Sequence, residues 1–187
     1  MPPKVKITKE DIVSTALAIV KKEGEQGINA RNIASKLGCS TQPIFYNFNS
    51  MEELMQDVIK KVEAIFSQYL CDEIERKEFP QYKATGVAYI RFAMEESELF
   101  KFLYMRNQAG ESMQNDTKFF DQSVEFIEKN MGLNKEMATI FHLESWLFVH
   151  GIASVIATGF LSLEWDLISK MISDFYNGIK NKFTEKV

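Results

Sequence analysis

The chain has 187 residues, of which 45% are hydrophobic, and its formal net charge at pH 7 is −4. The charge is uneven, because residues 1–50 carry a net +3 whereas residues 51–187 carry a net −7, so only the N-terminal part is suited to phosphates. Two cysteines, Cys39 and Cys71, cannot form a disulfide framework, and no apolar signal peptide opens the chain. We therefore expect a soluble, cytoplasmic protein.

The first predicted helix begins at Thr8, because Thr8 and Asp11 have the spacing of a capping box and precede an apolar run. Gly24 and Gly27 are expected to end this helix. Asn29 is a suitable N-cap for a second helix. The sequence thus predicts two helices in this segment, joined by a glycine-containing connection.

Residues 29–48 form the most informative stretch, since two apolar patterns with helical spacing flank a short turn. The apolar positions are Ile33, Ala34, Leu37, Ile44, Phe45 and Phe48. We expect all of these except Ala34 to pack between the helices. Gly38 can take the left-handed conformation that ends a helix, and Ser40 can cap the next helix. Two helices joined in this way are a helix-turn-helix, whose second helix enters the major groove of DNA.

A long helix is predicted to open at Ser50 and to continue to about Cys71, and Phe79-Pro80 then breaks the pattern. Further helices are expected over about residues 82–92, 99–105, 119–130, 135–160 and 163–183, with a loop at 107–116 and a turn at 131–134. No strand alternation is evident. The predicted fold class is all-α, with about nine helices. The predicted division is a helix-turn-helix domain at 1–52, a connecting helix at about 51–72 and a helical domain at 73–187.

One segment raises the question of a membrane span, because residues 146–163 carry no formal charge over eighteen positions. That length is at the lower limit for crossing a bilayer. Glu144 stands just before the segment, and no basic flank sets an orientation. A helix buried in an all-helical core or in a dimer interface has the same pattern, and we expect this second arrangement and no membrane.

The N-terminal pattern resembles the tetracycline-repressor (TetR) family of bacterial transcription regulators over about residues 10–54. The matching positions are Asn29, Arg31, Ile33, Ala34, Leu37, Gly38, Ser40, Ile44, Phe45, Phe48 and the Glu-Glu-Leu at 52–54. Phe45 stands where Tyr is common, Asn47 where His or Tyr is common, and Met51 where Lys is frequent. The lost hydroxyl and charge remove phosphate contacts at these places.

A second resemblance lies in the C-terminal half. The segment from Ser145 to Gly151, with Trp146 and His150, is similar to the Trp–His–Gly signature of one TetR subfamily. This resemblance implies a homodimer made by the last two helices. It also implies a ligand cavity in the C-terminal domain that controls DNA binding.

Polar side chains on and beside the expected third helix are the candidate DNA contacts. Gln and Asn can form bidentate hydrogen bonds with adenine, Thr can reach a base edge, and basic side chains on the second helix are suited to phosphates. The candidate DNA-binding residues are Arg31, Lys36, Ser40, Thr41, Gln42, Tyr46 and Asn47.

The C-terminal half is rich in Phe and Met, which can line an apolar pocket. The candidate ligand-binding residues are Tyr89, Phe92, Phe102, Tyr104, Phe120, His142, Trp146 and His150. Trp146 and His150 are one helical turn apart, so they form either a polar and aromatic pair in a pocket or a core Trp beside a hydrogen-bonded His. Two histidines eight residues apart and one acid are not a sound metal site.

The helix-turn-helix pattern predicts a DNA-binding regulator, and the TetR resemblance implies that it responds to a ligand and acts as a repressor. Its expected partners are a palindromic double-stranded operator, a small apolar or aromatic effector and a second copy of the chain. No nucleophile–base pair, paired carboxylates or phosphate loop is present at useful spacing, so we expect neither catalysis nor a cofactor. The alternative is a helical protein–protein interaction module that does not bind DNA.

Overall fold

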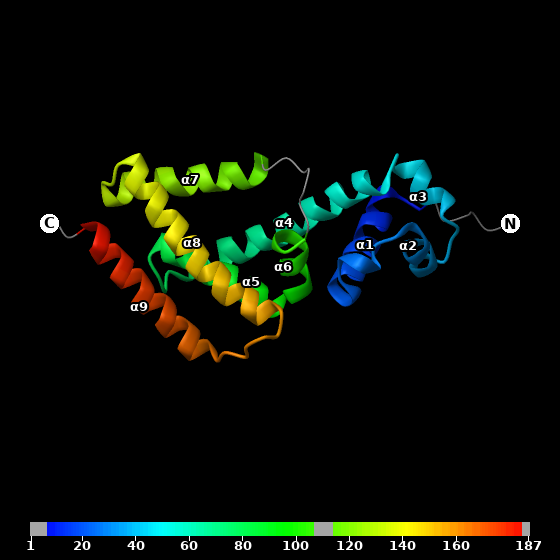
Figure 1. Cartoon of the computed structure of the whole chain (residues 1–187). Coiled ribbons are helices and arrows are strands. Elements are labelled where there is room, and N and C mark those ends of the chain that lie inside the picture. Colours follow the sequence, from blue (N-terminus) through cyan, green and yellow to red (C-terminus); the bar gives the residue numbers. More distant parts are fainter. Residues whose placement is uncertain (1–6, 107–113, 185–187) are drawn as a thin grey trace. The chain divides into compact units, whose positions relative to one another are not determined.

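The computed structural model describes residues 7–106 and 114–184, and within these ranges it contains nine α-helices and no strand (Figure 1). The helices are α1 (Lys9–Glu23), α2 (Ala30–Leu37), α3 (Gln42–Asn47), α4 (Met51–Arg76), α5 (Gln81–Glu95), α6 (Ser97–Tyr104), α7 (Gln114–Met131), α8 (Lys135–Ala157) and α9 (Trp165–Thr184), with a 3₁₀ turn at Glu25–Gly27. The predicted all-α fold class is confirmed.

The chain divides into two compact units. The N-terminal unit comprises Met1–Ser67 and Glu96–Arg106, and the C-terminal unit comprises Gln68–Glu95 and Asn107–Val187. Helix α6 therefore belongs to the N-terminal unit, although it follows α5 of the C-terminal unit in sequence. The predicted division had instead assigned the whole of residues 73–187 to one domain.

The start of α1 is fixed by the predicted capping box. The Thr8 hydroxyl accepts a hydrogen bond from the Asp11 backbone N–H at 3.1 Å, and the Asp11 carboxylate accepts one from the Thr8 N–H at 2.8 Å. Gly24 ends the helix with a φ of 74°. These bonds satisfy backbone groups that the helix ends would otherwise leave open.

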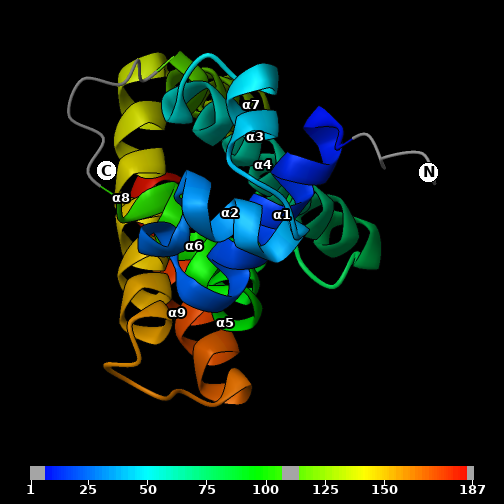
Figure 2. The same ribbon diagram turned by 90° about the vertical axis from the view of Figure 1, so that its right-hand side faces the viewer.

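The core of the N-terminal unit forms where α1 packs on α2 and α6, and Figure 2 shows α1 and α2 side by side. Its fully buried members include Ile12 and Ala16 of α1, Ile33 of α2 and Phe102 of α6. Gly24 also lies close to α6, since a Cβ there would be 2.9 Å from the Glu98 carboxylate. The N-terminal unit is thus built from two stretches of the chain.

Helix α4 ends at Arg76 instead of near Cys71, so the predicted end was wrong. Glu73, Glu75 and Arg76 are good helix formers, and they continue the helix past Cys71. Lys77 then takes a φ of 57°, which stops the helix before Pro80. Hydrophobic periodicity located the buried face of α4 but not its end.

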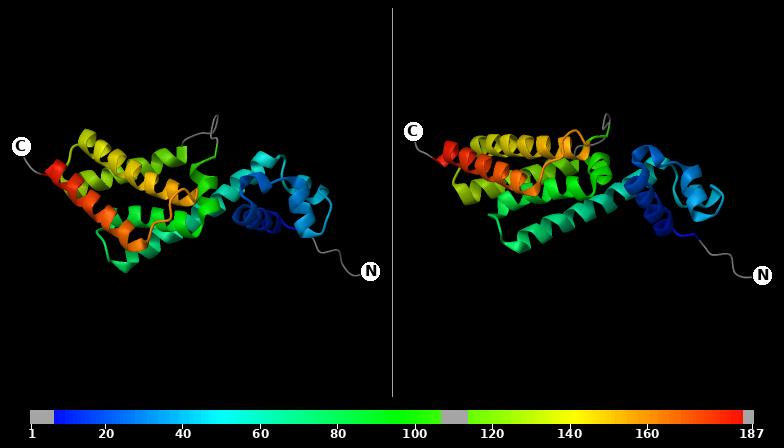
Figure 3. Two further views of the ribbon diagram at one scale, coloured as in Figure 1. Left: turned by 60° about the horizontal axis from the view of Figure 1, so that its bottom comes forward. Right: turned by 90° about the horizontal axis from the view of Figure 1, so that it is seen from below.

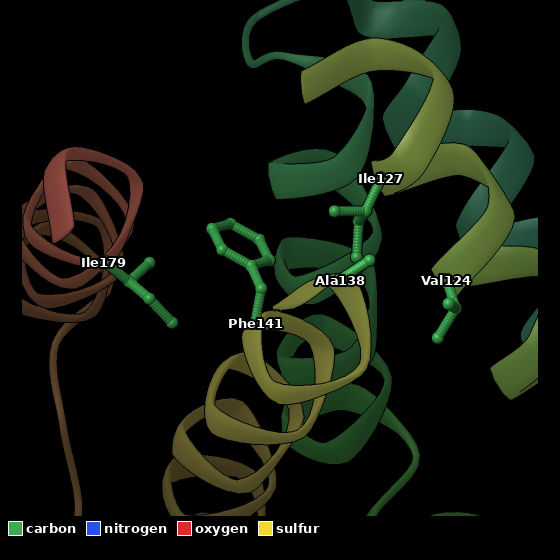
Figure 4. Close-up of a cluster of buried hydrophobic side chains, with 5 residues drawn as sticks. All are labelled: Val124, Ile127, Ala138, Phe141 and Ile179. Carbon is green, nitrogen blue, oxygen red and sulfur yellow. The ribbon is translucent and has the colours of Figure 1, made fainter. Parts of the chain in front are cut away.

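In the C-terminal unit, α8 packs against α5, α7 and α9, and the views in Figure 3 show α8 and α9 side by side. One buried cluster of this unit is drawn in Figure 4 and consists of Val124, Ile127, Ala138, Phe141 and Ile179. Helices α7, α8 and α9 each supply members of it. The cluster lies at the end of the unit where α7 connects to α8. The chain turns between these two helices at Gly132, which has a φ of 68°.

Two boundaries near α7 and α8 differ from the sequence prediction. Residues 107–113 of the predicted 107–116 loop lie outside the described residues, and α7 begins at Gln114, within that loop. Helix α8 ends at Ala157 instead of Phe160, because Gly159 takes a φ of 71°. Among the described residues α8 is the one helix long and apolar enough to cross a membrane. In its most apolar stretch of 18 residues, 28% of the residues are buried.

Candidate DNA-binding surface and effector site

The turn between α2 and α3 has the geometry that the sequence predicted. Gly38 is left-handed, with a φ of 66°. Its N–H donates to the Ser35 carbonyl at 3.2 Å, and the Cys39 N–H donates to the Ala34 carbonyl at 3.0 Å. This pair of bonds is a Schellman motif, which closes α2 and redirects the chain within a few residues.

Helix α3 begins one residue after Thr41, so the prediction that Ser40 caps it was wrong. The Thr41 carbonyl accepts hydrogen bonds from the N–H groups of Ile44 and Phe45. Pro43 lies in the first turn and has no N–H, which leaves fewer donors for a side-chain cap to satisfy. Ser40 is exposed in the turn.

One face of α3 is buried and the other is open to solvent. Ile44 and Phe48 point into the core and are almost completely buried. Gln42, Phe45 and Tyr46 are exposed, and the exposed fractions of the two aromatic residues are 55% and 85%. The prediction that Phe45 packs between the helices was therefore wrong, because a six-residue helix has room for only one buried stripe and Ile44 and Phe48 occupy it.

Asn47 and Thr41 lie at the margin of this open face and are half-buried. The Asn47 side-chain amide donates to the Pro43 carbonyl of its own helix at 2.8 Å. This bond holds the amide against the helix backbone. Gln42, which is exposed, is the side-chain amide that projects from the open face of α3.

The basic candidates on α2, Arg31 and Lys36, are both exposed. The Lys36 ammonium lies 3.2 Å from the Glu23 carboxylate at the end of α1, and the Asn32 amide donates to the same carboxylate at 2.8 Å. The hydrogen bond from Asn32, followed by that from Lys36, lowers the pKa of Glu23. The charge of Lys36 is thus partly balanced by Glu23, a partner that no local pattern in the sequence indicates.

Lys9 joins the start of α1 to α4. Its ammonium lies 3.0 Å from Asp57 and 3.4 Å from Glu53, and it stands 4.6 Å from the centre of the Phe48 ring. The hydrogen bond with Asp57 is the main cause that raises the pKa of Lys9. Lys9 therefore links the start of α1 to α4 at the protein surface.

In the C-terminal unit, His142 is a core residue. Only 6% of it is exposed, and a hydrogen bond of 2.8 Å joins its Nδ1 to the hydroxyl of Tyr82 on α5. The Phe120 ring stands edge-on at 4.7 Å between centroids. Burial lowers the pKa of His142 to about 4 and raises the pKa of Tyr82, so both groups are neutral near pH 7.

His150 makes the same kind of bond two turns further along. Its Nδ1 is joined to the hydroxyl of Tyr89 at 2.8 Å, and its ring stacks on Trp146 at 5.0 Å with an interplanar angle of 20°. Burial lowers the pKa of His150. Since 38% of Trp146 is exposed, this pair lies nearer the surface than His142.

The remaining aromatic candidates do not form one group with these histidines. Phe92 is fully buried in the C-terminal unit, where it contacts Tyr69 edge-on at 5.4 Å between ring centroids. Phe102 and Tyr104 belong to the N-terminal unit. There Phe102 is buried, and Tyr104 packs against Phe66 and Phe100.

A buried ion pair escaped the sequence analysis. Glu73 on α4 is only 2% exposed, and its carboxylate lies 2.9 Å from Nε of Arg91 on α5 and 3.3 Å from Arg76. The Arg91 guanidinium stands 3.8 Å above the Trp165 ring of α9. No local pattern marks these residues, because three helices bring them together.

No family model matches the sequence, and no curated protein matches it. Among solved structures, a protein of unknown function from Rhodococcus sp. RHA1 is similar at a TM-score of 0.76 with 17% identity, covering 99% of this chain and 100% of that one. A TetR-like transcriptional regulator from the same organism is similar at a TM-score of 0.64 with 13% identity, and the match covers 97% of this chain and 94% of that one. The multidrug binding protein EbrR, complexed with imidazole, is similar at a TM-score of 0.61 with 11% identity, and the match covers 89% of this chain and 93% of that one.

The chain has the TetR fold. The likeness extends over nearly the whole length of each chain, so it includes the helix-turn-helix as well as the C-terminal helices.

Proposed function

We propose that the protein is a DNA-binding transcription regulator that represses from a palindromic operator and is released by a small apolar or aromatic effector. The observation that carries the proposal is the open face of α3, which presents exposed polar and aromatic side chains directly after a tight turn. A second helix presented in this way fits the major groove. The TetR fold supports the same function.

In this proposal α3 contacts the bases, and α2 and the turn position the protein on the sugar-phosphate backbone of the DNA. Gln42 and Tyr46 face the base edges, and Thr41 and Asn47 contribute from the margin of the same face. Arg31, Lys36 and Ser40 contact phosphates, and such contacts fix register without reading sequence.

We also propose that the regulator is a cytoplasmic homodimer joined through α8 and α9. Ile140, Leu143, Leu147 and Gly151 follow one another at helical spacing on α8, and all four are exposed in the single chain. A Cβ on Gly151 would meet nothing within 4 Å. An apolar stripe of this length is suited to a second copy related by a two-fold axis.

The effector is proposed to bind in the C-terminal unit beside Trp146. The accessible stack of Trp146 on His150, held by Tyr89, offers an aromatic surface with polar groups at its edge. His142 and Phe120, which contact each other deeper in the C-terminal unit, support this site from the core. Bound effector would favour a dimer whose two recognition helices no longer match the operator spacing.

The experiment that tests the function is selection of bound duplexes from a random DNA pool by the full-length protein, followed by affinity measurements over a range of salt concentrations. A regulator enriches a two-fold symmetric sequence and loses affinity steeply as salt rises, because phosphate contacts release counterions. A protein–protein interaction module gives no enriched sequence. The absence of both enrichment and salt-dependent binding would therefore exclude the proposed function.

A further inference from the structure

We propose that Phe45 reads thymine methyl groups, so that the base pairs beneath α3 in each half-site are A·T pairs. This inference rests on the proposed function and adds to it the chemistry of the operator. It depends on two features of α3: an exposed phenyl ring that the core does not use, and the absence of charge on the helix.

The first feature is the position of Phe45. Its ring is 55% exposed although the adjacent Ile44 is completely buried, so packing of the N-terminal unit leaves Phe45 outside the core. A phenyl ring has no hydrogen-bonding group. In the major groove its one complementary surface is the 5-methyl group of thymine.

The second feature is the composition of α3, whose sequence QPIFYN contains no Lys, Arg, Asp or Glu. The commonest contact to guanine is a bidentate hydrogen bond from Arg or Lys, and cytosine is read by Asp or Glu. Helix α3 offers neither. It offers an amide at Gln42, which can pair with both N6 and N7 of adenine.

Gln42 and Phe45 are three residues apart and both exposed, so they share a face of the helix. Tyr46, 85% exposed, extends that face by one residue. An amide that pairs with adenine and a ring that covers thymine methyls therefore stand side by side. Because each A·T pair presents one adenine and one thymine, neighbouring A·T pairs can offer an adenine to Gln42 and a thymine methyl group to Phe45 at the same time.

The test uses the duplex selected from the random pool. Each thymine is replaced in turn by deoxyuridine, which keeps base pairing and removes only the methyl group. Binding is measured with the wild-type protein, with Phe45→Ala and with Phe45→Tyr. Phe45 is exposed, so neither substitution disturbs the core, and thermal unfolding checks this directly.

We expect the wild-type protein to lose affinity by about fourfold at symmetry-related thymines in both half-sites, which is the loss that corresponds to one buried methyl group. Phe45→Ala binds the thymine and deoxyuridine duplexes equally, because the group that contacts the methyl is gone. Phe45→Tyr keeps the ring and therefore keeps the difference. This comparison is a double-mutant cycle between one side chain and one methyl group.

Thr41 also carries a methyl group, so Thr41→Ser is the matched control. If the deoxyuridine effect disappears in Thr41→Ser and persists in Phe45→Ala, the inference is overturned. Selected half-sites with G·C pairs at their centre, or binding that is indifferent to every deoxyuridine, overturn it as well while leaving the proposed function standing. If no sequence is enriched at all, the proposed function itself fails.

Discussion

The Tyr82 hydroxyl on α5 and Nδ1 of His142 on α8 are joined by a hydrogen bond of 2.8 Å in the interior of the C-terminal unit. Tyr89 and His150 repeat the bond further along the same two helices. Two such bonds fix how α5 and α8 align, because sliding either helix by one turn would leave buried polar groups without partners.

Stability should fall as the pH decreases from 6.5 to 4.5. The folded protein holds the pKa of His142 at about 4, below its ordinary value of 6.5. In this window the unfolded chain therefore binds a proton that the folded chain does not, and stability rises with pH. The full pKa shift contributes about 3 kcal/mol to the free energy of unfolding at neutral pH, and most of this contribution is lost by pH 4.5. Urea unfolding at fixed protein concentration measures the slope.

His142→Gln is the control for this slope, because an amide can still hydrogen-bond to Tyr82 but does not titrate. The variant should show a smaller loss of stability between pH 6.5 and 4.5, with the residual slope due in part to His150, whose pKa burial also lowers. An unchanged slope would show that His142 is not buried in the neutral form.

Glu23→Gln should strengthen binding to all DNA sequences alike. The substitution removes the negative charge 3.2 Å from Lys36 and leaves an amide that can still accept from Asn32. We expect tighter binding at low salt, because Lys36 no longer has a carboxylate beside it, and a steeper dependence of affinity on salt concentration. Fluorescence anisotropy with selected and random duplexes measures both, and Lys36→Ala should produce the opposite change. A gain confined to the selected sequence would contradict a phosphate role.

Gly38→Ala should destabilise the N-terminal unit by about 1 kcal/mol, because an L-residue is strained in the left-handed conformation. A Cβ at Gly38 would meet nothing within 4 Å, so the cost comes from the backbone alone. Gly38→Asn is the matched variant, since Asn tolerates this conformation better. Thermal unfolding should rank the wild type above Asn and Asn above Ala. Equal stability of the two variants would show that a feature other than φ sets the cost.

Leu147→Glu should convert the protein from a dimer to a monomer. Leu147 is 59% exposed in the single chain and lies on the apolar stripe of α8, and a buried unpaired carboxylate in a dimer interface is costly. Sedimentation velocity at micromolar concentration measures the mass. Met94→Glu, at another exposed apolar position, is the control and should stay dimeric. A monomeric wild-type protein would rule out the proposed interface.

Titration with small apolar compounds should change the fluorescence of Trp146. Trp146→Phe should remove the response and leave that of Trp165, and Tyr89→Phe should weaken binding by releasing His150 from its hydrogen bond. Each compound that binds should also release DNA. Compounds that release DNA without any Trp146-dependent signal, and with unchanged affinity for His150→Ala, would place the effector site elsewhere.

Local features of the fold were predictable from the sequence because their physical causes are local. The capping box of Thr8 and Asp11, the cap at Asn29 and the turn at Gly38 each depend on residues a few positions apart. The burial of Ile33, Ile44 and Phe48 followed from helical periodicity.

The contacts that determine the chemistry of the candidate sites were not predictable in this way. Glu23 reaches Lys36 from another helix, and Tyr82 reaches His142 from sixty positions earlier in the chain. Periodicity also could not predict that Phe45 is exposed. It identifies apolar positions at helical spacing, but it does not indicate how many of them a short helix can bury. These contacts depend on tertiary packing, which a single sequence does not display.

The membership of α6 in the N-terminal unit limits how this protein can be dissected or recombined. Leu99, Phe100 and Phe102 are buried, and they reach that unit from a stretch of chain that follows α5. A fragment cut after Ser67 would lose the helix that covers α1 and expose its apolar side. A chimera that carries the N-terminal unit must therefore include two separate segments of the chain, because a single junction would omit α6.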